Sequence, residues 1–322
     1  MQSNTVRRSC GLGGRKGRPY TLLQSAICNP CPRPTQDRPQ REWLSCRIAL
    51  TSWGLYHRVL RMEKISAVMI VYNEEANLRD CLETVTWADE IVVVDSHSSD
   101  RTEEIARRYT DAFFQKTYRG HIDKKRFAVS KARHEWVFSI DADERVTPEL
   151  AEEIKETFRE GPGDVAGFDM PRLTRHLGRW IRHGEWYPDR VTRLFRKSRM
   201  RYEGTEPHDK VVLDGARGHF RGTILHYNYR DFAHQIETVQ AYSDQASRAL
   251  FEKGKRTGFF NLVLRPWAKF MKCYVLKRGV QDGWPGFIIA FTSAFYVLAK
   301  YAKLYELRLE ERNRGKGGEG GG

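Results

Sequence analysis

The feature that most constrains the fold is an apolar, strand-forming run at 136–140 that ends in two carboxylates, Asp141 and Asp143. In open α/β sheets, ligands bind at the carboxyl ends of the strands. Mg²⁺ and Mn²⁺ prefer a few hard carboxylate oxygens, with water and substrate phosphates completing an octahedron. The pattern therefore predicts a divalent-cation site at the end of this strand. The alternative is an acidic turn before the helix that residues 147–149 predict.

Strands and helices alternate through the first half of the chain. Apolar strand-forming runs occur at 65–71, 91–94, 112–115 and 136–140. Helical patterns separate them: Leu78, Cys81, Leu82 and Val85 recur at i, i+3, i+4 and i+7, and residues 124–133 also form a helical pattern. Between these, Asp100 and Glu103 predict a capped helix start. Strands that are apolar on both faces and alternate with amphipathic helices predict a parallel sheet with right-handed crossovers.

Polar residues follow three of these strands at the point where each one ends. They lie at 72–74, 95–96 and 141–143, and the carboxyl ends of parallel strands meet at one edge of a sheet. The chain has no Gly-rich phosphate loop of the dinucleotide or Walker type. A nucleotide would therefore be held by acids that contact its base or ribose, and by a metal ion that bridges its diphosphate.

Three of these segments resemble the family 2 glycosyltransferases of GT-A fold: 71–75, 94–102 and 141–143. This resemblance runs from about 65 to 160. Further segments resemble the enzymes that add glucose to the heptose of the lipopolysaccharide inner core: 186–190, 193–197, 208–211 and 282–286. Two positions depart from the family pattern, His97, where a small residue is frequent, and Asp209, where Glu is usual. The resemblance implies an α/β GT-A nucleotide-sugar-binding fold, a mostly parallel sheet flanked by helices.

The resemblance also implies a role for each strand-end residue. The nucleotide-sugar site would be formed by Tyr72, Asn73, Glu74, Asp95, Ser96 and Asp141. Asp143, with Asp141 beside it, would hold Mg²⁺ or Mn²⁺ against the diphosphate. His226 would complete the metal shell, although a buried, hydrogen-bonded histidine explains that residue as well. A divalent cation stabilises the charge that develops on the leaving diphosphate, mainly in the transition state.

An inverting transfer needs a base that takes the proton from the acceptor hydroxyl. The family places this base after Gly163, and the candidates there are Glu185, Asp189, Glu206 and Asp209. Asp189 is favoured because it precedes the segment 193–196, as the base does in related lipid-sugar synthases. Asp209 is the second choice. The alternative for Asp189 is a turn residue or a surface partner of Arg190.

The positive charge is concentrated in the N-terminal tail. Residues 1–61 hold eleven Lys/Arg and two Asp/Glu, which is +9 of the net +14 and leaves +5 for the rest. Nucleic-acid binding by the body is therefore poorly supported. The tail has no periodic apolar face, so we expect residues 1–61 to be disordered or a mis-assigned extension, with the natural start at Met62.

Four of the six cysteines lie in this tail. Cys28 and Cys31 have zinc-type spacing, but no second pair of ligands follows them. Cys81 and Cys273 lie on apolar helical faces of the body. We expect these two to be buried free thiols in a reducing compartment.

The remaining chain divides into three parts. Residues 62–230 are the predicted glycosyltransferase domain, with a nucleotide-sugar half at 62–160 and an acceptor half at 161–230. A helical, membrane-associating extension is predicted at 231–310, and a disordered tail at 311–322.

The extension is basic and aromatic. Between Lys253 and Arg278 the sequence has eight Lys/Arg and no acidic residue. The uncharged run at 284–299 is sixteen residues long, shorter than the roughly 18–20 that span a bilayer. This pattern favours a surface that lies on anionic lipid. The alternative is a core helix packed on the catalytic domain.

The sequence as a whole predicts a metal-dependent, inverting glycosyltransferase, peripheral on the cytoplasmic face of a bacterial inner membrane. It would move a hexose, glucose from UDP-glucose, to a heptose of the lipopolysaccharide core or a similar lipid-anchored saccharide. One alternative is transfer to a polyprenyl phosphate, which a pair of transmembrane helices would favour. Another is an inactive nucleotide-sugar-binding protein, which the presence of the metal acids and of a base disfavours. Nucleic acid is not an expected partner.

Overall fold

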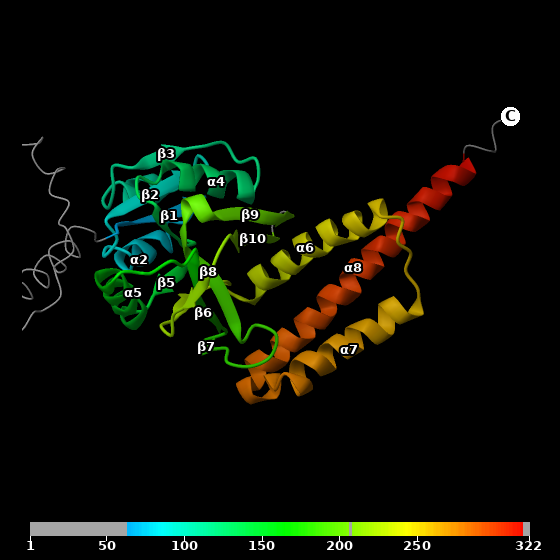
Figure 1. Cartoon of the computed structure of the whole chain (residues 1–322). Helices are drawn as coiled ribbons and strands as arrows, with labels where there is room; N and C mark the ends of the chain where they lie inside the picture. Colours follow the sequence, from blue (N-terminus) through cyan, green and yellow to red (C-terminus); the bar gives the residue numbers. More distant parts are fainter. Residues whose placement is uncertain (1–62, 206–207, 318–322) are drawn as a thin grey trace, which may run out of the picture. The chain divides into compact units, whose positions relative to one another are not determined.

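The computed structural model describes residues 63–205 and 208–317 (Figure 1). The strands are β1 Ile65–Val71, β2 Glu90–Asp95, β3 Phe113–Gln115, β4 Trp136–Ser139, β5 Glu144–Val146, β6 Gly167–His176, β7 Arg179–Trp180, β8 Asp189–Arg196, β9 Met200–Thr205, β10 His208–Leu213, β11 Arg217–His219 and β12 Ile224–His226. The helices are α2 Leu78–Glu83, α3 Thr102–Ala106, α4 His121–Lys131, α5 Pro148–Glu160, α6 Phe232–Glu252, α7 Arg265–Met271 and α8 Gly283–Gly317. The tail at 1–61, with its four cysteines, lies outside the described residues.

The main sheet has the strand order β3-β2-β1-β4-β8-β6-β12-β5. Its first four strands are parallel, as the alternation of strands and helices predicts. β8 then pairs antiparallel with both β4 and β6, while β12 runs parallel to β6 and antiparallel to β5. β9 and β10 form a separate antiparallel pair. This mixed sheet with flanking helices confirms the predicted GT-A fold class.

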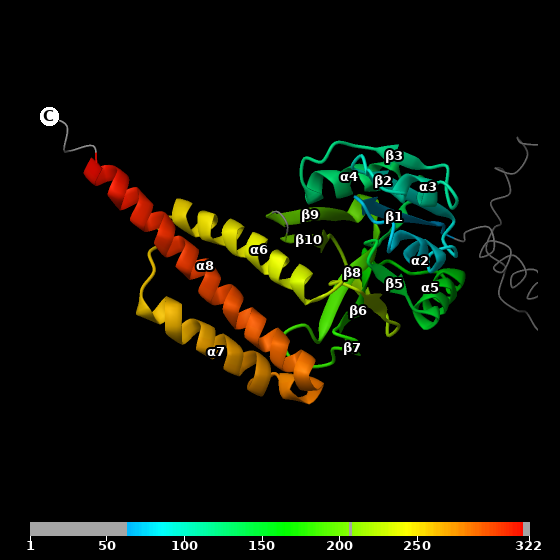
Figure 2. The ribbon, with the colours of Figure 1, turned by 180° about the vertical axis from the view of Figure 1, so that it is seen from behind.

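The core lies on both faces of the parallel strands, because successive side chains of a strand point to opposite faces. On one face, Met69 and Val71 of β1 pack with buried residues of α2 and α5 such as Leu82 and Ile154. On the other face, Val68 packs with α4 and β9. Figure 2 shows these helices around the sheet from behind. Polar residues lie at the carboxyl edge where β1, β2 and β4 end. Among them Tyr72 is exposed, whereas Asp95 is buried.

Two helices begin where the sequence predicts. The side chain of Thr147 accepts a hydrogen bond from the backbone N of Leu150 at the start of α5, and Asp231 accepts one from His234 at the start of α6. The prediction for α3 is wrong in detail, because its N-cap residue is Arg101. The Asp100 carboxylate accepts from the backbone N of Thr102, 3.0 Å away, and of Glu75, 3.1 Å away. It thereby ties the loop after β2 to the loop after β1.

The C-terminal helices form a layer in which α8 packs against both α6 and α7. α8 continues to Gly317, seven residues past the boundary drawn at 310, because ion pairs such as Arg308–Glu311 and Arg314–Glu310 support its last turns. By length and composition alone, the helical stretch 279–314 could cross a membrane, and 39% of its most apolar window is buried. The sequence analysis considered only the sixteen uncharged residues at 284–299, and it did not predict a helical stretch as long as 279–314.

Both cysteines of the body, Cys81 and Cys273, are buried free thiols, as predicted.

Candidate active site

The carboxyl edge of the sheet opens into a cavity of about 1500 Å³. Six of the residues predicted from the sequence line it together: Tyr72, Glu74, Ser96, Asp141, Asp143 and His226. β1, β2 and β4 are neighbours in the sheet, so their ends converge as expected. Residues of β8, β9 and β10 form another part of the wall. Among the predicted residues whose side chains are described, Asn73, Asp95 and Asp189 do not line the cavity.

Asn73 and Asp95 shape the loops at the mouth of this cavity. Asp95 is fully buried, and its carboxylate accepts hydrogen bonds from the backbone N of Ser98 at 2.9 Å and from its Oγ at 2.5 Å. Oδ1 of Asn73 accepts from the backbone N of Ser99 at 2.9 Å. The buried Oγ of Ser96 has no hydrogen-bond partner among the described residues. The loops are thus held in place while one buried hydroxyl stays available to a ligand.

Glu74 lies at the end of β1, and Asn77 donates from Nδ2 to its Oε2 at 3.0 Å. Burial raises the pKa of Glu74, and the hydrogen bond from Asn77 only partly opposes this effect. A hydroxyl group of a ligand could therefore donate a hydrogen bond to this carboxylate and replace part of the hydration that burial removes.

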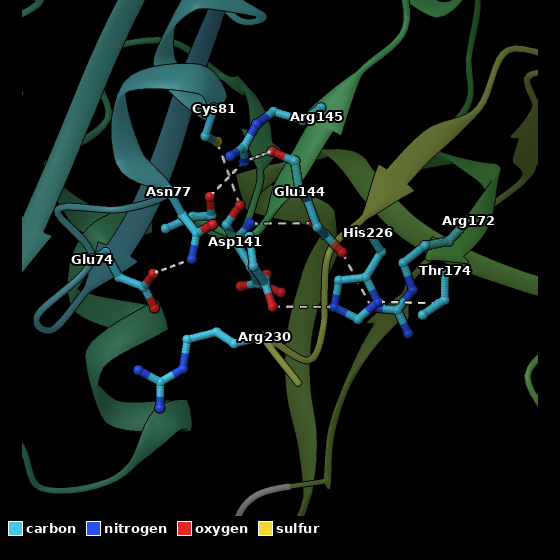
Figure 3. A network of polar contacts seen from close by, with 12 residues as sticks. Glu74, Asn77, Cys81, Asp141, Glu144, Arg145, Arg172, Thr174, His226 and Arg230 are labelled. Atoms are coloured by element: carbon cyan, nitrogen blue, oxygen red, sulfur yellow. Dashed lines mark hydrogen bonds and ion pairs between the residues drawn. The ribbon is translucent and has the colours of Figure 1, made fainter. Parts of the chain in front are cut away.

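Asp143 and His226 lie close together in the cavity wall. Nε2 of His226 lies 3.3 Å from Oδ2 of Asp143. The other ring nitrogen of His226, Nδ1, lies 3.3 Å from Oγ1 of Thr174 (Figure 3). The strand register explains this meeting, because β12 pairs with β5, which follows Asp143 directly. His226 is a buried, hydrogen-bonded histidine, as one of the two alternatives predicts, and it also lines the cavity. Its role as a metal ligand stays a prediction.

This pair fits a divalent cation. Its two ligand atoms are 3.3 Å apart, close to the roughly 3 Å edge of an octahedron with bonds of about 2.1 Å. Contact with Thr174 orients the histidine ring, as second-shell partners do in metal sites. The described residues contain no group of three or more His, Cys, Asp or Glu arranged to hold a metal ion. The remaining ligands would have to come from the diphosphate and water, as is usual for Mg²⁺.

Asp141 is paired with an arginine instead. NH2 of Arg193 contacts Oδ2 of Asp141, and the same nitrogen lies 2.5 Å from Oε1 of Glu144. Burial opposes ionisation of Asp141, yet the Arg193 guanidinium outweighs it and holds the pKa of Asp141 well below its usual range. Burial likewise disfavours the charge of Arg193, but Asp141 and Glu144 keep its pKa above the ordinary value. In this arrangement Asp143, rather than Asp141, is the carboxylate that faces His226.

A second arginine connects this network to the predicted base. Arg172 lies 3.1 Å from Oε1 of Glu144 and 2.8 Å from Oδ2 of Asp189. Asp189 and Arg172 are opposite each other in the β6–β8 register. The Asp189 side chain is 34% exposed, and its partner is Arg172, not Arg190. Arg190 donates instead to the backbone carbonyls of Asp169 and Phe220.

The other base candidates differ in position. Glu185 pairs with Lys269 and accepts from the thiol of Cys273 at 3.1 Å, away from the lining residues of the cavity. Asp209 belongs to β10, but its side chain lies outside the described residues, as does the whole of Glu206. Asp189 is therefore the only one of the four with a described side chain joined to the strand-end network.

Glu144, Arg172 and Arg193 were missed by the sequence reasoning. Glu144 is completely buried between the two arginines. A signal was present, because Arg193 stands next to Leu194 and Phe195 in a strand-forming run, and a charge at such a position is rarely buried unless it is paired.

Cationic side chains line the same cavity: Lys124, Lys125, Arg172, Arg190, Arg193, Lys210 and Arg217. Nζ of Lys124 donates to the carbonyl of Val71 at 2.6 Å. Burial lowers the pKa of Lys124 to about 8, although Asp95 favours its charged form. Such a surface suits a ligand that carries several negative charges.

The comparisons with known proteins agree with this chemistry. The family model described as glycosyl transferase family 2 matches residues 66–218. The lipopolysaccharide core biosynthesis glycosyltransferase LpsC of Rhizobium meliloti is 32% identical over 249 residues, which cover 75% of this chain and 92% of that protein. The chain belongs to glycosyltransferase family 2. An uncharacterized glycosyltransferase of Rickettsia typhi is 29% identical over 78% of this chain and 90% of its own length.

Solved structures are more distant from this family 2 glycosyltransferase. The S. aureus protein TarS (residues 1–349), in complex with UDP-GlcNAc, is 14% identical with a TM-score of 0.39, over 78% of this chain and 92% of that one. Glucosyl-3-phosphoglycerate synthase of Mycobacterium tuberculosis, in complex with Mg²⁺ and UDP, is 20% identical with a TM-score of 0.31. That match covers 38% of this chain and 47% of the other.

Proposed function

We propose that this glycosyltransferase moves glucose from UDP-glucose, with inversion, to a heptose of the lipopolysaccharide core or a similar lipid-anchored saccharide. We further propose that it works at the cytoplasmic face of a bacterial inner membrane. The observation that carries the proposal is the cavity at the carboxyl edge, where the pair Asp143–His226 and a group of cations converge. The near full-length similarity to a protein named for lipopolysaccharide core biosynthesis supports the acceptor class.

The donor half of the site binds the nucleotide sugar in this mechanism. Tyr72, Glu74 and Ser96 contact the nucleoside, while Asn73 and Asp95 hold the surrounding loops. Lys124 and Arg193 provide positive charge near the diphosphate. Asp143 and His226 would hold Mg²⁺ or Mn²⁺, which when bound stabilises the negative charge on the departing diphosphate.

The acceptor half supplies the base. As the acceptor hydroxyl oxygen bonds to the anomeric carbon, the bond from that carbon to the diphosphate oxygen breaks, and the hydroxyl proton passes to Asp189. Arg172, 2.8 Å from Oδ2 of Asp189, would hold this carboxylate in position. Asp209 is the second candidate for this role.

A screen of nucleotide sugars tests the proposal. Release of nucleoside diphosphate is measured with Mn²⁺, with Mg²⁺ and with EDTA, in the presence of purified core lipid, delipidated core saccharide or polyprenyl phosphate. We expect metal-dependent turnover of UDP-glucose with the two core acceptors. Turnover with polyprenyl phosphate alone would favour the alternative acceptor, and absence of turnover with every donor would favour an inactive binding protein.

Asp189→Asn and Asp209→Asn then locate the base. Loss of general-base catalysis lowers kcat by about 10²–10⁴-fold, and we expect that loss for Asp189→Asn. Donor binding should persist in this variant. A fully active Asp189→Asn enzyme together with an inactive Asp209→Asn enzyme would reassign the role to Asp209.

A further inference from the structure

The segment around α7 exposes a continuous apolar stripe. Phe260, Val263 and Leu264 lie in the π-helical turn Phe260–Leu264, and Trp267 follows in α7. Their exposed fractions are 57, 47, 44 and 65%. Phe259, just before them, is 72% exposed. No described part of the chain covers this stripe, so its burial requires a partner outside the described residues.

α8 extends the same surface. Its exposed apolar side chains recur every seven residues, at Trp284, Phe291, Leu298 and Tyr305. Trp284 is 80% exposed. Phe287 joins the two helices, since its ring centroid lies 5.8 Å from that of Phe270 and 6.1 Å from that of Trp284. We call the exposed side chains of 259–276 and of 284, 287, 291, 298 and 305 the α7–α8 face.

Several cations on and beside this face form no ion pair with a described carboxylate. Among the described residues, no ion pair involves Lys255, Arg256, Lys272, Lys277 or Arg278, all of which are exposed. Lys269 is different, because it pairs with Glu185. A second copy of the chain on this face would bring like charges together, so the charge pattern disfavours a symmetric dimer there. It matches an anionic surface.

The opposite side of α8 is occupied by protein. Nε2 of Gln235 in α6 donates to Oγ1 of Thr292 in α8 at 3.0 Å, and both residues are buried. Lys303 pairs with Asp244 of α6 at 2.7 Å. A helix crossing the hydrocarbon with α6 beside it would carry these charges into the bilayer, at a cost of several kcal/mol. The contacts therefore favour a helix that lies in the interface over one that spans.

We propose that the α7–α8 face binds the surface of an anionic phospholipid bilayer, with both helices lying in the interface. This inference rests on the membrane location proposed above and names the surface that would make the contact, but it does not depend on the reaction. The face is also joined to the acceptor half, because the buried Asp282 carboxylate accepts from the backbone N of Arg182 and of His183, at 3.2 and 2.8 Å. A docked bilayer would then lie beside the loop that leads to Asp189.

Vesicle binding of the full chain tests the charge. We compare phosphatidylcholine vesicles with vesicles containing a third phosphatidylglycerol, at constant salt. Replacing Lys272, Lys277 and Arg278 with Gln should weaken binding to the anionic vesicles roughly 100-fold, since each cation contributes about 1 kcal/mol. The matched control replaces Lys64, Arg79 and Arg221 with Gln. These residues are exposed and form no ion pair among the described residues, and their replacement removes the same charge. An equal loss in the control would overturn the proposal.

Tryptophan quenching tests the geometry. Brominated lipids should quench the fluorescence of wild-type protein bound to vesicles, and Trp267→Phe/Trp284→Phe should lose most of that quenching while keeping its fold. Unchanged quenching in the double variant would place other tryptophans in the lipid and overturn the assignment. Bound protein should be released by alkaline carbonate. Resistance to carbonate would indicate a spanning helix, and a stable dimer that no longer binds vesicles would indicate a second copy as the occupant.

Discussion

The carboxyl edge of the sheet and the α7–α8 face deal with charge in opposite ways. At the sheet edge, Asp141, Glu144 and Asp189 each contact an arginine, and Glu144 is completely buried. On and beside the α7–α8 face, cations such as Lys272 and Arg278 are exposed and without ion pairs among the described residues. The first region is internally compensated, which suits a site that must hold a fixed geometry. The second leaves its charge and apolar surface to an external partner.

The largest effect on turnover is expected at Asp143, the carboxylate of the sheet edge for which no arginine partner is described. Its carboxylate contacts only His226 among the described side chains and faces the cavity. Asp143→Ala should lower kcat by roughly 10³-fold or more, because a divalent cation supplies several kcal/mol of transition-state stabilisation. The urea midpoint should move little. Near-normal turnover at saturating Mn²⁺ would remove Asp143 from the proposed metal site, and Asp164→Ala on the surface serves as the control.

The second effect concerns the buried centre of the network. Glu144→Ala leaves Arg172 and Arg193 short of a partner, and loss of one member of a buried ion pair costs about 3–5 kcal/mol of unfolding free energy. Glu104 offers a matched control, since it also contacts two arginines but is 48% exposed. Glu104→Ala should lower the unfolding free energy far less, because exposed ion pairs contribute little. Similar urea unfolding curves for both variants would show that the sheet-edge network does not stabilise the fold.

The parallel half of the fold and its polar strand ends could be predicted from the sequence, because both follow from patterns within short stretches of neighbouring residues. β1, β2 and β4 are apolar on both faces, and each is followed at once by polar residues. The side-chain contacts of the site, in contrast, join residues that are far apart in the sequence. His226 reaches Asp143 only through the antiparallel register of β12 and β5, and Arg193 reaches Glu144 across 49 residues. Residue patterns do not specify such contacts, although a lone arginine in an apolar strand indicates that one exists.

In the C-terminal layer, too, local composition could be predicted but contacts between distant residues could not. The basic and aromatic composition of 253–278 was evident, but which cations stay unpaired was not. Lys269 lies within that stretch and yet pairs with Glu185, more than eighty residues earlier in the chain. The segment 282–286 matched a family pattern without a stated role. Its Asp282 holds a loop one hundred residues away.

The third prediction tests the link between the two regions. The Asp282 carboxylate accepts hydrogen bonds from two backbone N–H groups, and its Oδ1 lies 3.1 Å from Nδ1 of His183. Asp282→Asn replaces this carboxylate with a neutral amide. Hydrogen bonds to charged groups contribute about 1.5–3 kcal/mol each, so we expect a loss near 3 kcal/mol. If the link positions the acceptor loop, the KM for the acceptor should rise while donor affinity, measured by calorimetry, stays constant. Equal changes in both constants would indicate general destabilisation instead.

The smallest expected effect is a pH dependence of the unfolding free energy that comes from His176. This residue lies between the two regions. Its ring centroid is 5.1 Å from that of Trp186 and 6.0 Å from that of Tyr229. Burial lowers the pKa of His176 to about 4. The unfolded chain, with an ordinary histidine pKa near 6.5, then binds the proton first as the pH falls. Stability from this residue is therefore present above about 6.5 and is lost as the pH falls toward 4.

Between pH 7 and pH 5 this linkage amounts to about 2 kcal/mol. His176→Phe keeps the aromatic packing but has no proton to bind, so its unfolding free energy should fall less over that interval. Urea unfolding of both proteins at the two pH values gives the difference directly, and the carboxylates of the sheet edge cancel in it. Parallel losses in the two proteins would mean that His176 is hydrated in solution and that the junction between the regions is looser than its ring contacts indicate.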